Sequence, residues 1–294
     1  MSTVTPVTEQ LLRAMALPAP GGDSKDGRGR VLVVAGCTGL PGAVLLSANA
    51  ALRAGTGKLQ LAVCRDLAIP LGIAVPEALV IGLPQTENGN IDRAGADGLA
   101  ARAGSSDAVL AGPGMIEDAE TQAVVTALVR GAAESALVLD AGALIAVRAD
   151  PGLTRMRASP AVLTPHAGEM AQLLGQDREA IEADPLAAAR QASERFGTVT
   201  VMKGSRTHIV TPDGRAWCYE AGHVGLAISG SGDTLAGIMV GLLARGAAPE
   251  TAALWSVYAH GEAGRRLGRR HGGIGYLARE IPGEIPAILA GVSA

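Results

Sequence analysis

Short, continuous apolar runs alternate along this chain with helical segments, and glycine turns separate them. Three clear runs are Val31–Ala35, Ala108–Ala111 and Ala136–Leu139. Apolar runs of this kind, without polar alternation, are typical of parallel strands that are buried on both faces. The pattern therefore predicts an α/β fold, in which a mostly parallel sheet carries helices on both faces.

The whole pattern can be written as a series of expected elements. The expected strands are Val31–Ala35, Leu59–Val63, Leu79–Ile81, Ala108–Ala111, Ala136–Leu139, Ala161–Leu163, Val199–Met202, Thr207–Val210 and Ala216–Tyr219. The expected helices are Glu9–Leu17, Ala43–Ala54, Ala94–Arg102, Thr121–Arg130, Glu169–Leu174, Pro185–Arg195, Gly232–Arg245 and Glu250–Arg270. The hairpin-type turn Asp213-Gly214 predicts an antiparallel excursion on the parallel sheet.

The chain divides near Arg30. Residues 1–29 hold a short helical arm and a linker, because Pro18–Gly29 is rich in proline, glycine and charge. Residues 30–294 are expected to form a single catalytic domain.

Composition excludes several classes of partner. The 294 residues carry a net charge of −3 and only one Phe, two Trp and three Tyr, so we expect no nucleic-acid partner. No signal peptide or membrane span is visible, and we expect no membrane partner. The cysteines Cys37, Cys64 and Cys218 form no CxxC pair, which favours a reducing, cytoplasmic location without disulfides or zinc.

A glycine-rich turn, Gly230-Ser231-Gly232-Asp233, opens a long apolar helix. Free backbone N–H groups at a helix start, together with the helix dipole, attract phosphate. Asp233 is a candidate to accept a proton from a substrate hydroxyl. In isolation, it is equally well explained as an ordinary N-terminal helix residue.

Four further motifs follow expected strands. They are the glycine loop Gly36–Gly42, the turn Gly112-Pro113-Gly114, the segment Thr164–Glu169 and the segment Lys203–Thr207. Each also has a structural explanation, as a turn, a structural histidine (His166) or an exposed lysine at a strand end. Because all five motifs fall at strand ends or helix starts on one side of one sheet, together they predict a phosphate-bearing ligand.

This succession of motifs resembles the ADP-dependent NAD(P)H-hydrate dehydratase family, over roughly Arg30 to Gly264. The resemblance implies a ribokinase-like three-layer fold, a homotetramer, and a hydro-lyase without an epimerase domain. Members use ADP (ATP in eukaryotes) and Mg²⁺ to convert the S form of NADH or NADPH hydrate to NADH or NADPH. Phosphate is placed on the ring hydroxyl and then eliminated, leaving AMP and phosphate. The sequence itself shows no cluster of metal ligands.

The resemblance also implies residue roles. Asp233 would activate the hydroxyl, and the amides of Gly230, Ser231 and Gly232 would stabilise the transferring phosphoryl group. The nucleotide would be held by Lys203, Gly204, Ser205, Arg206 and Thr207, with Gly232. The hydrated nicotinamide nucleotide would be contacted by Ala43, Gly114, His166 and Asp233.

The chain departs from the family pattern in three places, and three other interpretations stay open. The departures lie in Ala35–Thr38, in Met115-Ile116 and in His223–Ser229, where fine substrate contacts are affected. The main alternative is a small-molecule kinase of the same superfamily, of the hydroxyethylthiazole-kinase type. A Rossmann oxidoreductase that uses the Gly36–Gly42 loop would need an acidic residue at the end of the second strand to hold the ribose, and the chain offers Cys64-Arg65-Asp66 there, a poor match. A nucleotide-binding protein without activity is the third.

Overall fold

A ten-stranded sheet forms the centre of the structure, a computed structural model that describes residues 3–19 and 24–293. Its strands are β1 (Val4–Pro6), β2 (Arg30–Val34), β3 (Lys58–Cys64), β4 (Ala78–Leu83), β5 (Ala108–Ala111), β6 (Ala136–Leu139), β7 (Val162–Leu163), β8 (Val199–Met202), β9 (Thr207–Val210) and β10 (Ala216–Tyr219). Their spatial order is β1-β10-β9-β8-β7-β6-β5-β2-β3-β4. All neighbours from β8 to β4 pair in parallel, whereas β9 is antiparallel to both β8 and β10. The predicted parallel sheet with an antiparallel excursion is confirmed.

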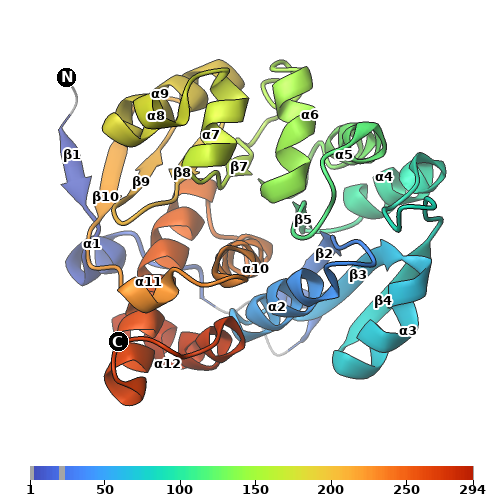
Figure 1. Cartoon of the computed structure of the whole chain (residues 1–294). Coiled ribbons are helices and arrows are strands. Elements are labelled where there is room, and N and C mark those ends of the chain that lie inside the picture. The colour runs from blue at the N-terminus through green and yellow to red at the C-terminus, as the bar shows by residue number, and fades with distance from the viewer. Residues whose placement is uncertain (1–2, 20–23, 294) are drawn as a thin grey trace.

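Helices cover both faces of this sheet. They are α1 (Glu9–Ala14), α2 (Pro41–Arg53), α3 (Arg65–Ala74), α4 (Ala96–Gly104), α5 (Ala119–Gly131), α6 (Leu144–Ala149), α7 (Ala167–Leu174), α8 (Arg178–Ala183), α9 (Pro185–Phe196), α10 (Ser231–Ala244), α11 (Pro249–His271) and α12 (Ile281–Ser293). Figure 1 shows α2, α10 and α11 on one face, and α5, α6, α7 and α9 on the other. The three layers match the predicted fold class.

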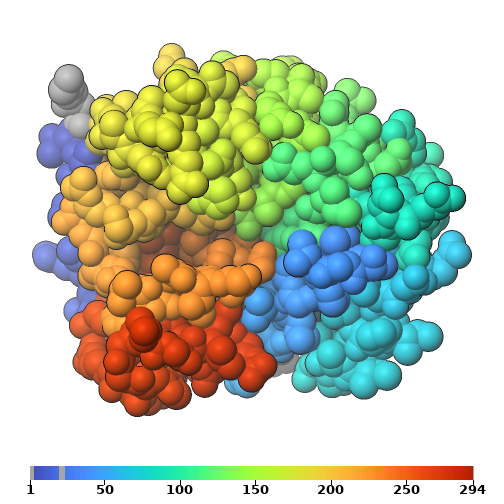
Figure 2. Space-filling model, in the orientation of Figure 1, coloured from blue at the N-terminus to red at the C-terminus, as the bar shows by residue number. Residues whose placement is uncertain are grey.

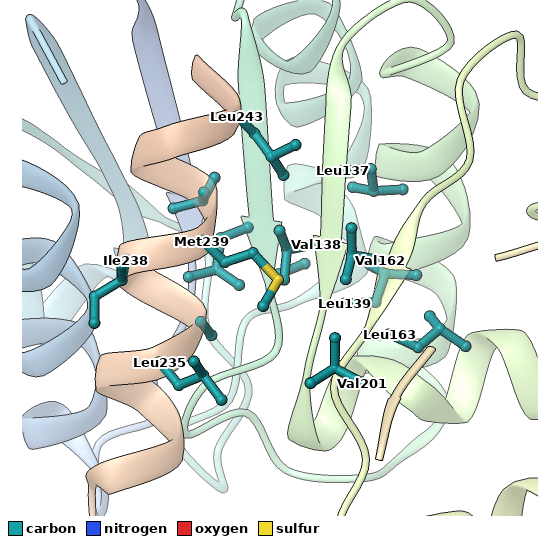
Figure 3. Packing of buried hydrophobic residues seen from close by; sticks show 14 of the residues in the cluster. Leu137, Val138, Leu139, Val162, Leu163, Val201, Leu235, Ile238, Met239 and Leu243 are labelled. Carbon is teal, nitrogen blue, oxygen red and sulfur yellow. The ribbon is translucent and has the colours of Figure 1, made fainter. Parts of the chain in front are cut away.

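Helix α10 contributes much of the core beneath the sheet. Met239 points from α10 toward Val138 of β6, and both side chains are fully buried (Figure 3). Burial of an apolar side chain of this size stabilises a fold by about 1.5–3 kcal/mol. A layer of such contacts fixes α10 against the central strands.

Two glycines let α10 lie unusually close to α2. A Cβ atom on Gly237 would lie 2.4 Å from the carbonyl oxygen of Ser47, and one on Gly241 would lie 2.7 Å from Ala54 Cβ. Near the helix starts, a Cβ on Gly230 would lie 2.4 Å from Leu46 Cδ1. The two helices therefore run side by side in the same direction, and both N-termini face the same end of the sheet.

The carboxyl ends of the parallel strands lie at that same end. Val34 of β2 pairs with Ala111 of β5, which pairs with Leu139 of β6, and Leu139 pairs with Leu163 of β7. The residues that follow these strands, including Gly36, Gly112, Asp140 and Thr164, therefore meet at one edge. In open parallel sheets this edge is where ligands bind.

The N-terminal segment adds a strand that the sequence did not indicate. β1 pairs in parallel with β10, and the Val7 N–H donates to the carbonyl oxygen of Cys218 (2.9 Å). The arm helix ends at Ala14 rather than Leu17, and part of the predicted linker lies outside the described residues. The division of the chain at Arg30 stays a prediction.

Helix α3 was also missed, because Pro70 lies inside it and proline disfavours helix interiors. The short helices α6 and α8 were missed as well. Within residues 3–19 and 24–293, no helix combines the length and apolar character of a membrane span.

Candidate active site

Lys203 is at the centre of a charged cluster that joins the ends of β6 and β8 to helix α7. It follows β8, and its Nζ donates to Asp140 Oδ1 at 2.9 Å, just beyond β6. The same Nζ lies 3.7 Å from Glu169 Oε2 on α7. Burial lowers the pKa of Lys203, but the charges of Asp140 and Glu169 outweigh burial and raise it above its usual value. Lys203 therefore remains a cation in this site.

Asp140 is fixed from a second side. Thr164 Oγ1, at the end of β7, donates to Asp140 Oδ1 at 2.7 Å. Asp140 is 2% exposed, so its carboxylate depends on these partners instead of water. The sequence placed Asp140 at a strand end but assigned it no role.

Asp233 lies in the first turn of α10 and belongs to the same electrostatic cluster. Burial and then repulsion by Asp140 raise the pKa of Asp233 to about 6, against the opposing effect of Lys203. A carboxylate with a pKa near neutrality is a stronger base than an ordinary aspartate and is still ionised at pH 7. The arrangement suits Asp233 to accept a proton.

The start of α10 presents backbone N–H groups beside Lys203. Gly230 adopts a left-handed conformation (φ +89°), and the first helical hydrogen bond runs from the Thr234 N–H to the Gly230 carbonyl (3.1 Å). The Gly232 amide precedes that bond, and a Cβ on Gly232 would lie 3.4 Å from Lys203 Nζ. The Ser231 N–H instead donates to the Ile228 carbonyl at 3.3 Å. Gly232 is therefore well placed to bind an anion that also contacts Lys203.

A cavity of about 740 Å³ opens next to this helix start. That volume lies within the usual range of small-molecule sites. Figure 2 shows a hollow on this face between the yellow and orange parts of the chain. The predicted site residues that line the cavity are His166, Lys203, Gly204, Ser205, Thr207, Ser231 and Gly232. Tyr219, His223, Val257 and His260 line it as well.

Arg206 is placed differently from its neighbours. Its Nη1 lies 3.6 Å from Glu220 Oε1, and both side chains are largely exposed. Arg206 is absent from the residues that line the cavity. Of the segment Lys203–Thr207, the structure brings four residues to the cavity and directs the Arg206 side chain to Glu220.

Ala43, in the first turn of α2, lies beside Gly114, which follows β5. The Gly36 N–H donates to the Pro113 carbonyl (2.8 Å), which joins the first glycine loop to the Gly112–Gly114 turn. Gly114 has φ +68°, and a Cβ there would lie 2.8 Å from Ala43 Cβ. This close approach requires glycine, and it sets two of the predicted substrate contacts side by side.

His166 has a structural role that the sequence left open. It is the N-cap of α7: its Nδ1 accepts a hydrogen bond from the Glu169 N–H (3.1 Å), and Glu169 Oε2 accepts one from the His166 N–H (2.7 Å). This reciprocal cap orients Glu169 toward Lys203. The His166 side chain is 60% exposed and also lines the cavity.

The Asp66 carboxylate has a partner of its own in this structure. Asp66 lies in the first turn of α3, and its Oδ2 accepts a hydrogen bond from Gln85 Nε2 at 2.6 Å. Asp66 thus lies two residues beyond the end of β3, with its carboxylate already bound to Gln85.

Comparisons with known proteins agree with this geometry. A family model described as NAD(P)H-hydrate dehydratase matches residues 31–287. The chain is 48% identical over 286 residues to an ADP-dependent (S)-NAD(P)H-hydrate dehydratase of Xanthomonas campestris, and the match covers 97% of this chain and 96% of that protein.

Solved structures also resemble this chain, and a dehydratase matches it better than a kinase does. An ADP/ATP-dependent NAD(P)H-hydrate dehydratase from Bacillus subtilis, co-crystallised with ATP/Mg²⁺, has a TM-score of 0.82 at 27% identity, covering 99% of this chain and 100% of that one. A hydroxyethylthiazole kinase from Pyrococcus horikoshii has a TM-score of only 0.57 at 18% identity, covering 90% and 89%, and this shows a shared fold alone. The chain has a ribokinase-like fold and belongs to the NAD(P)H-hydrate dehydratase family.

Proposed function

We propose that this chain repairs nicotinamide nucleotides by ADP-dependent dehydration of the S form of NADH or NADPH hydrate. It is a hydro-lyase in which ADP is the co-substrate, and the products are NADH or NADPH, AMP and phosphate. The observation that carries the proposal is the position of Asp233, a carboxylate whose pKa is raised to about 6. It lies near Lys203, in the first turn of the helix whose start lines the cavity.

The first chemical step is phosphoryl transfer. Asp233 takes the proton of the substrate's ring hydroxyl while that oxygen bonds to the terminal phosphorus of ADP. The bond between that phosphorus and the bridging oxygen breaks, and AMP leaves. The Gly232 amide and Lys203 stabilise the negative charge on the transferring group, with Gly230 and Ser231 shaping the turn.

The second step is elimination. The carbon–oxygen bond breaks, phosphate leaves, and a proton is lost from the neighbouring ring carbon, which restores the ring double bond. In total one water is removed from the substrate and ADP is hydrolysed to AMP. Lys203 and the start of α10 hold the departing phosphate as they held the phosphoryl group.

The two substrates occupy opposite sides of Asp233 in this proposal. The nucleotide is held by Lys203, Gly204, Ser205 and Thr207, with Gly232, whereas Arg206, which pairs with Glu220, takes no part. The hydrated nicotinamide nucleotide is held by Ala43, Gly114, His166 and Asp233. Support comes from the two groupings in the structure: four residues of the Lys203 segment line the cavity, and Ala43 lies so close to Gly114 that no side chain fits between them.

Magnesium fits the residues present only if nucleotide phosphates complete its shell. Among the described residues, no three His, Cys, Asp or Glu side chains are grouped to hold a metal ion. Mg²⁺ in nucleotide sites is usually held by one or two carboxylates together with phosphates and waters. Asp140 and Glu169, which flank Lys203, are the carboxylates that would hold it. When bound, it would neutralise charge on the phosphates.

We also propose a homotetramer and a cytoplasmic location. The three cysteines are buried and free, which suits a reducing compartment.

Product analysis tests the proposal. The protein is incubated with hydrated NADPH, Mg²⁺ and ADP, and phosphorus NMR follows the products. AMP, free phosphate and NADPH in equal amounts support a dehydratase. A phosphorylated alcohol that accumulates with no dihydronicotinamide absorbance would instead indicate a kinase and contradict the proposal.

A further inference from the structure

His260 contacts the start of α10 from the neighbouring helix, α11. Its Nε2 lies 3.0 Å from Ser231 Oγ and also 3.0 Å from the Ser231 carbonyl oxygen. Both His260 and Ser231 line the cavity. The sequence assigned His260 no role, because it lies in the interior of a long helix, 29 positions from Ser231.

The Ser231 carbonyl oxygen decides which nitrogen of the His260 ring carries the hydrogen. A neutral imidazole has one N–H and one bare nitrogen, and a carbonyl oxygen can only accept. A bare Nε2 at 3.0 Å would face the carbonyl lone pairs without a hydrogen between them. A protonated Nε2 instead donates to the carbonyl and is shared with Ser231 Oγ. The geometry therefore selects the Nε2–H tautomer.

The ring also stays neutral. Burial lowers the pKa of His260 to about 4, the bond to the Ser231 backbone opposes this, and the charge of Lys203 lowers it further. At neutral pH the His260 ring is therefore uncharged, and its two possible forms differ only in which nitrogen carries the hydrogen.

The tautomer leaves the Ser231 hydroxyl proton unused. Ser231 Oγ accepts from His260, so its own O–H is free to donate elsewhere. The Ser231 backbone N–H is already bonded to Ile228. Ser231 lines the same cavity as Gly232 and Lys203, where a phosphoryl oxygen is the acceptor that the proposed reaction supplies.

We propose that His260 is a positioning residue, which donates from Nε2 to Ser231 and thereby makes the Ser231 hydroxyl a hydrogen-bond donor to the phosphoryl group of the nucleotide. The role of the hydroxyl rests on the proposed function. The tautomer does not, because it follows from the contacts of His260 alone.

The tautomer is measured directly in the wild-type protein. Nitrogen-15 NMR of the imidazole rings distinguishes Nε2–H from Nδ1–H, and His260→Gln identifies the His260 signals among the five histidines. The Nε2–H form at pH 7, with or without ADP, is the expected result. The Nδ1–H form would overturn the inference, whether or not the protein is a dehydratase.

A double-mutant cycle tests the consequence for catalysis. Ser231→Ala removes the donor and is expected to lower kcat by about 100-fold, the usual cost of losing one such donor, with little change in KM for ADP. His260→Leu removes the orienting group and is expected to lower kcat by about 10-fold, the cost of a typical hydrogen bond. In the Ser231→Ala background, His260→Leu should have almost no further effect.

The conservative variant separates orientation from packing. The side-chain NH₂ group of Gln can donate as Nε2–H does, so His260→Gln should recover most of the lost kcat. Equal losses from His260→Leu with and without the Ser231 hydroxyl would show that His260 acts independently of Ser231, and would overturn the proposal. A wild-type protein without dehydratase activity would refute the proposed function instead, while the NMR result would still decide the tautomer.

Discussion

Lys203 Nζ lies 2.9 Å from Asp140 Oδ1, and this ion pair ties the end of β8 to the end of β6 directly beside Asp233. Both partners act on Asp233: the charge of Asp140 raises its pKa, and the charge of Lys203 lowers it. The pair therefore adjusts the basicity of the proposed catalytic base.

The first prediction concerns pH. Asp233 must be ionised to act as a base, so kcat/KM should fall as the pH drops through about 6. Asp140→Asn removes a charge that raises the pKa and should move this acid limb to lower pH. Lys203→Met removes a charge that lowers the pKa and should move it to higher pH. Measurement of kcat/KM from pH 4 to 8 for the wild type and the two variants checks both shifts. If the fall in kcat/KM at low pH occurs at the same pH in all three proteins, this electrostatic account is refuted.

The second prediction concerns the close contact between α10 and α2. In Gly237→Ala the new methyl group would lie 2.4 Å from the Ser47 carbonyl oxygen, so the helices must separate. The free energy of unfolding should fall by about 1–3 kcal/mol, as for other overpacked cores. Gly283→Ala, in α12 with nothing within 4 Å, is the control and should raise stability by about 0.4–1 kcal/mol. Urea denaturation measures both, and equal effects would contradict the packing argument.

The third prediction concerns the N-terminal arm. Leu12 of α1 is fully buried, and Trp255 Nε1 of α11 donates to the nearby Met15 carbonyl (2.8 Å). Leu12→Ala should therefore cost about 2–5 kcal/mol of unfolding free energy, as buried leucines do elsewhere. The exposed Gln10→Ala on the same helix should change it by less than about 0.5 kcal/mol. Thermal or urea unfolding that leaves Leu12→Ala as stable as its control would show that the arm is not part of the core.

The fourth prediction separates the two substrates. Gly114→Ala forces a methyl group to 2.8 Å from Ala43 Cβ in a left-handed backbone conformation. We expect KM for hydrated NADPH to rise while the Kd for ADP stays unchanged, since Gly114 does not line the nucleotide cavity. Gly98→Ala, on the surface of α4 with open space around it, is the control. Isothermal titration with ADP and steady-state kinetics decide the point; a loss of ADP binding would contradict this division of the site.

Most of the sheet could be predicted because central strands such as β2, β5 and β6 carry continuous apolar runs that are followed by a glycine or a polar residue. β1 could not, because Val4–Pro6 is short and its strand character comes only from pairing with β10, more than two hundred positions away. α3 was hidden by Pro70, whose cost the tertiary packing of Leu67 and Leu71 offsets.

The site could be predicted where motifs carry a local signal, such as the glycine turn before Asp233. Asp140 was missed because its partner Lys203 lies 63 positions further along the chain. His260 was missed because the sequence of a helix does not indicate that one of its histidines faces the carbonyl of Ser231 on another helix. In both cases the role comes from a contact made only in the folded chain.

The measurement that tests the central claim most directly is recovery of dihydronicotinamide absorbance from hydrated NADPH by the wild type and by Asp233→Asn. With ADP and Mg²⁺, absorbance should grow for the wild type, stop without nucleotide, and grow at least about 100-fold more slowly for Asp233→Asn, because the base is lost while the side-chain shape is kept. Binding of ADP to both proteins, measured in parallel, excludes misfolding as the cause. Equal rates for the two proteins would contradict the role of Asp233, and no growth with either ADP or ATP would contradict the function itself.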